Sequence, residues 1–186
     1  MRKIQLLMLF VLSAIIFQGC KKDVVTSAST TSDQILAATI NGTSWIPDDV
    51  TATITYNAAA KTKTFAVQGT ADSKRVKWTI TLSDATVTSA NAFPLATYKV
   101  DNTSRVQMGY YQINDDNVYE QVGTVEPGSG SIIVTAIDPT KNLITGTYSF
   151  YSRKVNYNTD GSVASVTTQQ IAGGSFTNLP YTFAVN

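Results

Sequence analysis

The strongest constraint on the fold is a two-residue alternation of apolar and polar side chains. Residues 76–82, VKWTITL, place Val76, Trp78, Ile80 and Leu82 on one face and three polar residues on the other. Successive side chains of a β-strand point to opposite sides of the sheet, so this pattern is typical of a strand with one buried face. No stretch of the chain shows a convincing helical period. The alternation therefore predicts an all-β protein.

Similar segments follow one another from residue 36 onward and are separated by turn-forming residues. They are Leu36–Ile40, Thr51–Tyr56, Thr64–Gly69, Val76–Leu82, Leu95–Val100, Val106–Ile113, Val118–Val122, Ser131–Ile137, Leu143–Val155, Val163–Ile171, Ser175–Thr177 and Tyr181–Val185. About ten strands at short spacing favour an antiparallel β-sandwich or a flattened β-barrel. The pattern does not separate a filled sandwich from a hollow barrel that could hold a small apolar ligand.

Several short motifs predict local features of this fold. Asn41-Gly42 is a strong hairpin dipeptide. Asp138 starts a turn in which its side chain can accept hydrogen bonds from backbone N–H groups. Gly146, inside a long strand, predicts a bulge or a close backbone approach. Ser131–Ile137 is apolar at nearly every position, which suggests burial on both faces or a barrel-like wrap.

The first 20 residues have the layout of a secretory signal. Arg2 and Lys3 precede an apolar run from Ile4 to Phe17, and Gly19-Cys20 follows. The run is too short to cross a bilayer comfortably, since that takes about 20 residues. The segment resembles the lipobox of bacterial lipoproteins, in which the cysteine is lipidated and becomes the mature N-terminus. The resemblance implies that Cys20 attaches the protein to the cell envelope, at the outer membrane, facing either the periplasm or the surface.

These observations divide the chain into three parts. Residues 1–19 are the expected lipoprotein signal peptide, residues 20–34 a flexible tether rich in Ser and Thr, and residues 35–186 a single all-β domain. Removal of residues 1–19 leaves 12 of the 14 basic residues beside 13 acidic ones. A chain so close to neutral has no electrostatic footprint for nucleic acid, and we expect none as a partner.

Composition also narrows the chemistry. The chain has no His, and Cys20 is its one cysteine. A Ser-His-Asp or Cys-His triad is therefore absent, as is the usual general base near neutral pH. We expect a non-catalytic binding or scaffolding protein without cofactor or metal. The alternative is a hydrolase of envelope or extracellular glycans that uses carboxylates, for instance Glu120 or Glu126 with Asp115 or Asp116.

Longer motifs of the domain resemble a known family. The segments are ATINGTSW (38–45), LATYKV (95–100), GSGSIIVTAIDPTKNLITGTYSFYS (128–152) and IAGGSFTNLPYT (171–182). Together they are similar to a family of Bacteroidota lipoprotein domains of unknown function. The resemblance implies an all-β fold and a periplasmic or outer-membrane location, and it implies no activity.

Exposed tyrosines are the candidate ligand-binding residues. Tyr110, Tyr111, Tyr119 and Tyr151 lie on predicted strands, and exposed aromatic rings can stack on sugars. Adjacent Tyr110 and Tyr111 must face opposite ways. The ligand could be a glycan, a small molecule or a protein, and packing at the sheet surface explains the same residues without any ligand. The loop Asn114–Asn117 is rich in oxygen atoms, but such residues are also the usual ones of hairpin turns, so we expect no metal there.

Overall fold

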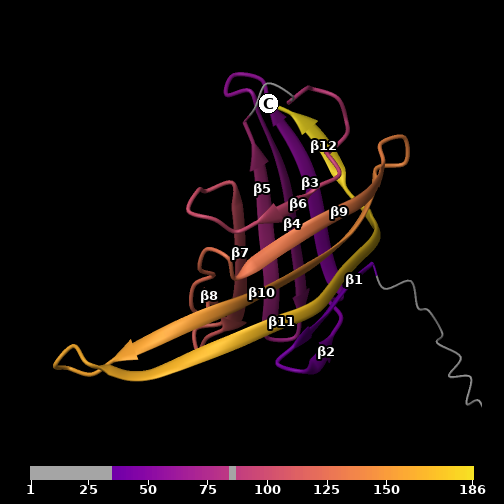
Figure 1. The fold of residues 1–186 in the computed structure, drawn as a ribbon. Coiled ribbons are helices and arrows are strands. Elements are labelled where there is room, and N and C mark those ends of the chain that lie inside the picture. Colours follow the sequence, from indigo (N-terminus) through magenta and orange to yellow (C-terminus); the bar gives the residue numbers. More distant parts are fainter. Residues whose placement is uncertain (1–34, 84–86) are drawn as a thin grey trace, which may run out of the picture. The chain divides into compact units, whose positions relative to one another are not determined.

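Two six-stranded β-sheets pack face to face as a β-sandwich (Figure 1). The computed structural model describes residues 35–83 and 87–186; the predicted signal peptide, Cys20 and the tether lie outside them. The all-β prediction is confirmed, and a sandwich, not a closed barrel, is the architecture. Within the described ranges the structure has no helix with the length and apolarity that a membrane crossing needs.

The first sheet, sheet A, consists of six strands. In spatial order they are β2 (Thr43–Trp45), β1 (Leu36–Ile40), β11 (Val163–Pro180), β10 (Leu143–Tyr157), β9 (Gly130–Asp138) and β6 (Thr97–Lys99). All neighbouring strands in this sheet are antiparallel. The second sheet, sheet B, contains β12 (Thr182–Val185), β3 (Asp49–Asn57), β4 (Thr62–Ala71), β5 (Lys74–Leu82), β7 (Val106–Ile113) and β8 (Tyr119–Gln121). Only the β12–β3 pair is parallel among the pairs of described strands, a departure from the antiparallel prediction.

The core lies between the sheets and is formed by the alternating apolar positions. From sheet B, Trp78 is buried, and its ring centroid lies 4.3 Å from that of Tyr148 and 5.8 Å from that of Phe176, both of sheet A. Phe65 contacts Phe176 as well, with centroids 6.1 Å apart. Burial of each large side chain stabilises the fold by about 1.5–3 kcal/mol, so this aromatic cluster is a main source of cohesion between the layers.

One charged residue, Lys63, is buried at the edge of the core, next to the segment that follows β5. Lys63 lies on the inner side of β4, where its Nζ donates hydrogen bonds to the carbonyls of Ala90 (2.8 Å) and Ala92 (2.9 Å). Burial lowers the pKa of Lys63, because removal from water disfavours the charged ammonium. The two carbonyls replace part of the lost hydration and fix the segment over the core.

The predicted turn motifs are confirmed. Asn41 and Gly42 have φ angles of 52° and 80°, and a type I′ hairpin turn requires such positive angles at both central residues. The Asp138 carboxylate accepts hydrogen bonds from the backbone N–H groups of Thr140 (3.0 Å) and Lys141 (3.1 Å). At Gly146 the register shifts, and a Cβ there would collide with the Ile133 carbonyl and the Phe176 ring.

Two expectations about strands were wrong. Residues 163–171 and 175–177 form one strand, β11, because Gly173-Gly174 makes an irregularity within the strand instead of ending it. The apolar segment Ser131–Ile137 is buried on one face only, and Ile133 is 37% exposed. No described element covers the outer side of β9, so the apolar residues there face solvent.

The long hairpin of β10 and β11 extends beyond its neighbours (Figure 1). Strand β9 pairs with β10 only from Leu143 to Phe150, and β1 pairs with β11 only from Ile171 to Phe176. Residues 151–153 of β10 still have a neighbour, because the backbones of Tyr151 and Arg153 bond Ser129 and Thr124. The two-stranded part beyond them, Lys154–Tyr157 with Val163–Thr167, is called the arm below. Nearer the domain, the Asn41 side chain accepts a hydrogen bond from the Gln170 N–H (2.8 Å).

Candidate functional site

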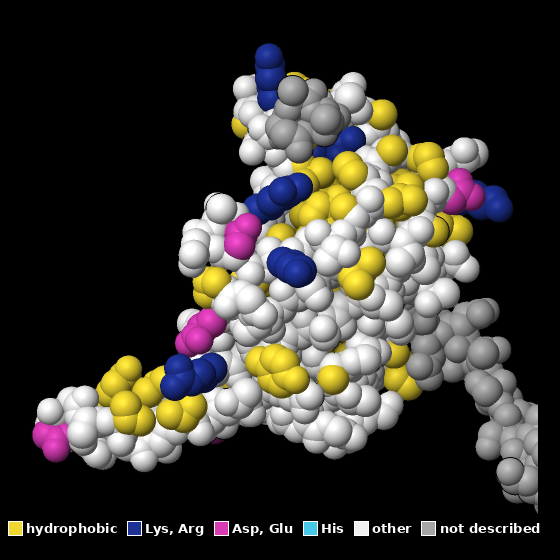
Figure 2. Space-filling model, viewed as in Figure 1, with side chains coloured by type: hydrophobic (Ala, Val, Ile, Leu, Met, Phe, Trp, Pro, Cys, Tyr) yellow, Lys and Arg dark blue, Asp and Glu magenta, His cyan; other side chains and the backbone are white. Residues whose placement is uncertain are grey.

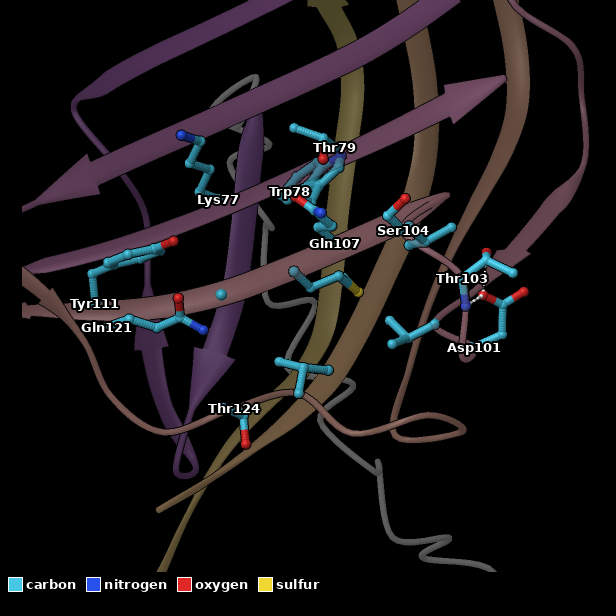
Figure 3. A pocket seen from close by; sticks show the side chains of 15 residues that line it. Lys77, Trp78, Thr79, Asp101, Thr103, Ser104, Gln107, Tyr111, Gln121 and Thr124 are labelled. Carbon is cyan, nitrogen blue, oxygen red and sulfur yellow. Dashed lines mark hydrogen bonds between the residues drawn. The ribbon is translucent and has the colours of Figure 1, made fainter. Parts of the chain in front are cut away.

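A cleft of about 420 Å³ lies beside β7, where this strand has a neighbour on one side only (Figure 3). Strand β5 pairs with β7 over Val106–Gln112, whereas β8 pairs with it only from Tyr111 to Ile113. The other wall of the cleft comes from residues of the 100–104 and 124–125 segments. The short β8 thus leaves an opening at the edge of sheet B.

Gly123 explains why β8 is so short. Its φ of +75° turns the chain away from β7 after the N–H of Val122 has bonded the Tyr110 carbonyl (2.8 Å). The chain then reaches Arg153 of β10, with reciprocal backbone hydrogen bonds to Thr124 of 2.9 and 2.8 Å. A Cβ at Gly123 would stand 2.5 Å from the Arg153 carbonyl group, so glycine is required for both the backbone angle and the close approach.

Tyr111 forms the aromatic side of the cleft. A Cβ at Gly109 would lie 2.8 Å from Cε2 and 3.0 Å from the hydroxyl oxygen of Tyr111, so the ring extends over the glycine on the outer face of β7. Lys77 pairs with Gly109 across the strands and lines the cleft as well. In Figure 3, Tyr111 and Lys77 lie at one end of the cleft. The absence of a side chain at Gly109 allows the aromatic ring to lie flat along the sheet.

Neutral polar side chains provide most of the other functional groups. Thr79 and Gln107 come from paired positions of β5 and β7, Gln121 from β8, and Thr124 from the crossing segment. Amides and hydroxyls both donate and accept hydrogen bonds. The buried side chains of Val106 and Met108 contribute apolar surface beneath them. The cleft therefore offers one aromatic face, an apolar floor and several uncharged hydrogen-bonding groups.

Asp101 is the one carboxylate among the described residues that line this cleft. It accepts hydrogen bonds from the backbone N–H (2.8 Å) and the hydroxyl (2.5 Å) of Thr103. These two bonds, with a smaller contribution from the charge of Arg105, lower the pKa of Asp101. The carboxylate is thus held ionised, at the opposite end of the cleft from Lys77 (Figure 3).

The four candidate tyrosines do not form a common surface. Tyr110 is 1% exposed and belongs to the core, because the alternation of β7 turns Val106, Met108 and Tyr110 inward. Burial raises the pKa of Tyr110. Its ring cannot present a face to a ligand, which corrects the proposal of this residue as a binding residue. Tyr111, its neighbour, faces the other way, as the alternation of adjacent residues requires, and lines the cleft.

Tyr119 and Tyr151 lie outside the cleft lining. The Tyr119 hydroxyl donates a hydrogen bond to the Asp72 carbonyl (2.9 Å), and the Arg75 guanidinium carbon lies 3.8 Å from its ring centroid. One face of this ring is therefore already covered. Tyr151 is exposed on the other sheet, where its hydroxyl accepts a hydrogen bond from Gln170 (3.2 Å).

The acidic residues of the alternative hydrolase hypothesis have other contacts. Glu120 accepts a hydrogen bond from the Asn114 side chain (3.0 Å), and Glu126 forms an ion pair with Arg153 (3.3 Å). In the 114–117 turn, the side-chain Oδ1 of Asn114 accepts hydrogen bonds from the N–H groups of Asp116 (3.0 Å) and Val118 (2.9 Å). Within residues 35–83 and 87–186 no three His, Cys, Asp or Glu residues are grouped as metal ligands would be.

The sequence comparison places most of the chain in one family. Residues 32–180 match the family described as Domain of unknown function (DUF6252). The protein belongs to the DUF6252 family. No curated protein and no solved structure matches the chain. The predicted resemblance to a family of unknown function is confirmed to this extent.

In this DUF6252 domain, the sequence motifs and the cleft are separate features. Asn41-Gly42, Asp138 and Gly146 shape turns and strands, whereas the cleft is formed by Tyr111, Asp101 and the residues between them. Sequence reasoning found Tyr111 but missed Lys77, Asp101, Gln107 and Gln121. Alternation alone places Lys77 and Gln107 on the outer face of their strands, yet no sequence signal brings the 100–104 segment beside them.

Proposed function

We propose that this DUF6252 protein is a lipid-anchored, non-catalytic binding protein of the bacterial cell envelope, and that its cleft beside β7 binds a carbohydrate. The Tyr111 ring over Gly109, bordered by amide and hydroxyl side chains, is the observation that carries the proposal. The anchoring part rests on residues 1–20, which resemble a lipoprotein signal ending in Cys20.

The chemistry of the cleft suits a sugar better than an apolar or a highly charged ligand. A pyranose ring has an apolar C–H face that stacks on an aromatic ring, and its hydroxyls both donate and accept hydrogen bonds. Gln107, Gln121 and Thr124 provide such partners around Tyr111. Lys77 and Asp101 bring one charge of each sign, so the cleft does not select strongly for an ionic ligand.

The same residues favour binding over hydrolysis. Glycosidases ordinarily use two carboxyl groups, about 5–10 Å apart, on either side of the scissile bond. The described lining includes Asp101 alone, and hydrogen bonds keep it ionised, whereas a general acid needs a raised pKa. Glu120 and Glu126 remain the acids of the alternative hydrolase hypothesis, and neither belongs to this lining.

A glycan-array screen of the full chain tests the binding proposal. We expect wild type to bind one class of glycan and Tyr111→Ala to lose about five- to tenfold in affinity, since stacking of a sugar on one aromatic ring contributes about 1–1.5 kcal/mol. Tyr151→Ala is the matched control, because this tyrosine is exposed but lies on sheet A, outside the cleft. Equal losses in both variants, or none in either, would contradict the proposed site.

A second experiment tests the anchor by itself. Cells that express wild type or Cys20→Ala are labelled with a lipid precursor, and we expect label on wild type alone. A stable anchor needs more than one acyl chain, which the triacylated N-terminus of bacterial lipoproteins provides. Absence of label on the wild-type protein would contradict the lipid anchor. The binding proposal would not be affected, because it rests on the cleft alone.

A further inference from the structure

The edge of β7 that borders the cleft has backbone groups without hydrogen-bond partners. Just before β7, the Arg105 carbonyl accepts a bond from the Thr81 N–H of β5 (2.7 Å), so the odd-numbered residues of β7 point their backbone groups toward β5. Val106 and Met108 therefore point theirs toward the cleft, which both residues line. No described residue bonds the backbone N–H or C=O of either one.

Both residues are buried, which makes these unpaired groups unusual. Val106 is 3% exposed and Met108 is 7% exposed. Roughly 90% or more of the buried backbone N–H and C=O groups in proteins are hydrogen-bonded. On this side of β7, β8 pairs with Tyr111–Ile113 only, because the chain leaves the sheet at Gly123. The cleft continues the line of β8 along the unpaired edge.

An extended peptide has the backbone groups that this edge can bond. In an antiparallel pair of strands, alternate residues exchange an N–H···O=C bond in each direction with the residue opposite. Val106 and Met108 offer two donors and two acceptors at this spacing, about 6.8 Å apart. An added strand obtains affinity from such main-chain bonds and specificity from its alternate side chains. The edge therefore favours a peptide, whereas the Tyr111 ring beside it favours a sugar.

We infer that the ligand of the cleft is a peptide that carries a sugar, and that its backbone adds a short strand to β7 with the antiparallel direction of β8. The sugar half of the inference rests on the proposed function. The peptide half rests on the backbone groups of Val106 and Met108 alone. The ligand class is therefore a glycosylated protein segment in an extended conformation.

The alternation of side chains determines where the sugar is attached. Gln107 faces away from the core, so the peptide residue opposite Gln107 points to the same outer face. A sugar on that residue lies beside the Gln107 amide and reaches the Tyr111 ring, which extends over Gly109 (Figure 3). The peptide residues before and after it point to the buried side, where Val100 and Val125 line the cleft. We therefore expect small apolar side chains at both of these peptide positions.

The first experiment compares peptide, sugar and glycopeptide on the full chain in mild detergent. The peptide SVTVS carries an N-terminal fluorophore, and its central Thr is unmodified or linked to mannose, N-acetylglucosamine or N-acetylgalactosamine. By fluorescence polarisation, we expect at least one glycopeptide to bind at least about tenfold more tightly than the bare peptide and than the competing methyl glycoside of the same sugar.

Three outcomes of this experiment would overturn the inference. They are equal affinity of the glycopeptide and the bare peptide, equal affinity of the glycopeptide and the free glycoside, and no binding of any glycopeptide. Equal affinity of the free glycoside, with a loss in Tyr111→Ala, would leave the proposed carbohydrate site intact. Binding of the bare peptide that Tyr111→Ala does not weaken would contradict the proposed function as well.

N-methylation of the glycopeptide tests the strand pairing without any change to the protein. In the antiparallel register, the two Val residues beside the glycosylated Thr point their N–H groups to β7, and the N–H of the Thr points away. We expect N-methylation of either Val to weaken binding at least about threefold more than N-methylation of the Thr, which is the matched control. Equal losses, or a larger loss at the Thr, would overturn the arrangement.

A pair of variants removes the same kind of bond from the protein side. Val106→Pro and Val106→Ala both lose the valine side chain, but only proline removes the N–H that faces the cleft. Val106 is the first residue of β7, a position at which strands tolerate proline. We expect Val106→Pro to bind the glycopeptide about three- to tenfold more weakly than Val106→Ala, with no such difference for the free glycoside. The same difference for the free glycoside would contradict the peptide pairing.

The arm is a second surface to which the apolar side chains of the peptide can adsorb. Figure 2 shows hydrophobic side chains on the projecting hairpin, and Tyr157 there is 64% exposed. Tyr157→Ala is therefore the control for such adsorption, and we expect it to bind the glycopeptide as wild type does, whereas Tyr111→Ala loses about five- to tenfold. A larger loss in Tyr157→Ala than in Tyr111→Ala would place the peptide on the arm and overturn the inference.

Discussion

Both halves of the β10–β11 hairpin alternate apolar and polar residues, but their apolar side chains lie on opposite faces and have different contacts. In the inner half, Tyr148 and Phe150 point inward and pack against the opposite sheet. In the arm, the apolar residues Val155 and Tyr157 occupy the opposite alternating positions, on the outer face of the hairpin, and their side chains remain partly or largely exposed. The difference teaches that alternation determines which residues share a face, whereas burial requires a second layer that lies over that face.

The largest expected difference between the halves is in the cost of removing an aromatic ring. Phe150→Ala leaves a cavity between the sheets and should lower the free energy of unfolding by about 3–5 kcal/mol. Tyr157→Ala, seven residues further along the same strand, should change it by less than about 0.5 kcal/mol. Urea unfolding of both variants measures this. Comparable losses would mean that the arm is packed in solution as tightly as the core.

Two glycines with positive φ provide the next comparison. Gly123→Ala should destabilise by about 3 kcal/mol, because the backbone strain adds to a collision with the Arg153 carbonyl group. Gly161→Ala, in the turn of the arm, has no atom within 4 Å of its new Cβ and should cost only about 1 kcal/mol. Thermal unfolding distinguishes them. A smaller loss at Gly123 than at Gly161 would contradict the close approach beside the cleft.

Removal of a tyrosine hydroxyl should also have different effects on stability in the core and at the surface of the hairpin. The buried Tyr148 hydroxyl has no hydrogen-bond partner among the described residues, and burial raises its pKa. Tyr148→Phe should therefore stabilise by about 1 kcal/mol. Tyr151→Phe, with an exposed hydroxyl, should change stability little. Denaturant midpoints report both, and a loss of stability in Tyr148→Phe would reveal a buried partner for the hydroxyl.

The smallest expected effect is a pH dependence that belongs to the core. Since the pKa of Lys63 is lowered in the folded state, the unfolded chain holds more protons between the folded pKa and 10.5, and stability should rise with pH in that window. Lys63→Met should remove this rise, whereas Lys154→Met, on the arm, should keep it.

Urea unfolding at a series of pH values up to about pH 10 is the suitable measurement. Above about pH 10 the raised pKa values of Tyr148 and Tyr181 act in the opposite direction, because the unfolded tyrosines lose their protons first and stability falls. An equal slope in wild type and Lys63→Met would assign the pH dependence to other groups.

Much of the fold could be predicted because it depends on local patterns. The alternation of Val76–Leu82 and the Asn41-Gly42 turn each depend on residues that are close together in sequence, and both predictions are confirmed. The strand predictions were wrong where one local sequence pattern is compatible with two different structures. Gly173-Gly174 resembles the end of a strand but forms an irregularity within β11, and Ile133 belongs to an apolar segment yet faces solvent.

The candidate site was predicted only in part, for a related reason. Tyr111 was found because its alternation with Tyr110 sends one ring outward, but choosing between the two required knowledge of which face is covered. The cleft also needs the 100–104 segment and the crossing at Gly123, and contacts between residues so far apart in sequence leave no periodic signal.

By itself, the sequence determined the all-β class, the turns, and the lack of histidine and of any thiol besides Cys20. Only the tertiary structure decided that the sheets form a sandwich, that Tyr110 is buried while Tyr111 lines a cleft, and that the apolar face of the arm lies uncovered. The physical reason is that alternation is a property of one strand, whereas burial is a property of the layers that pack against it.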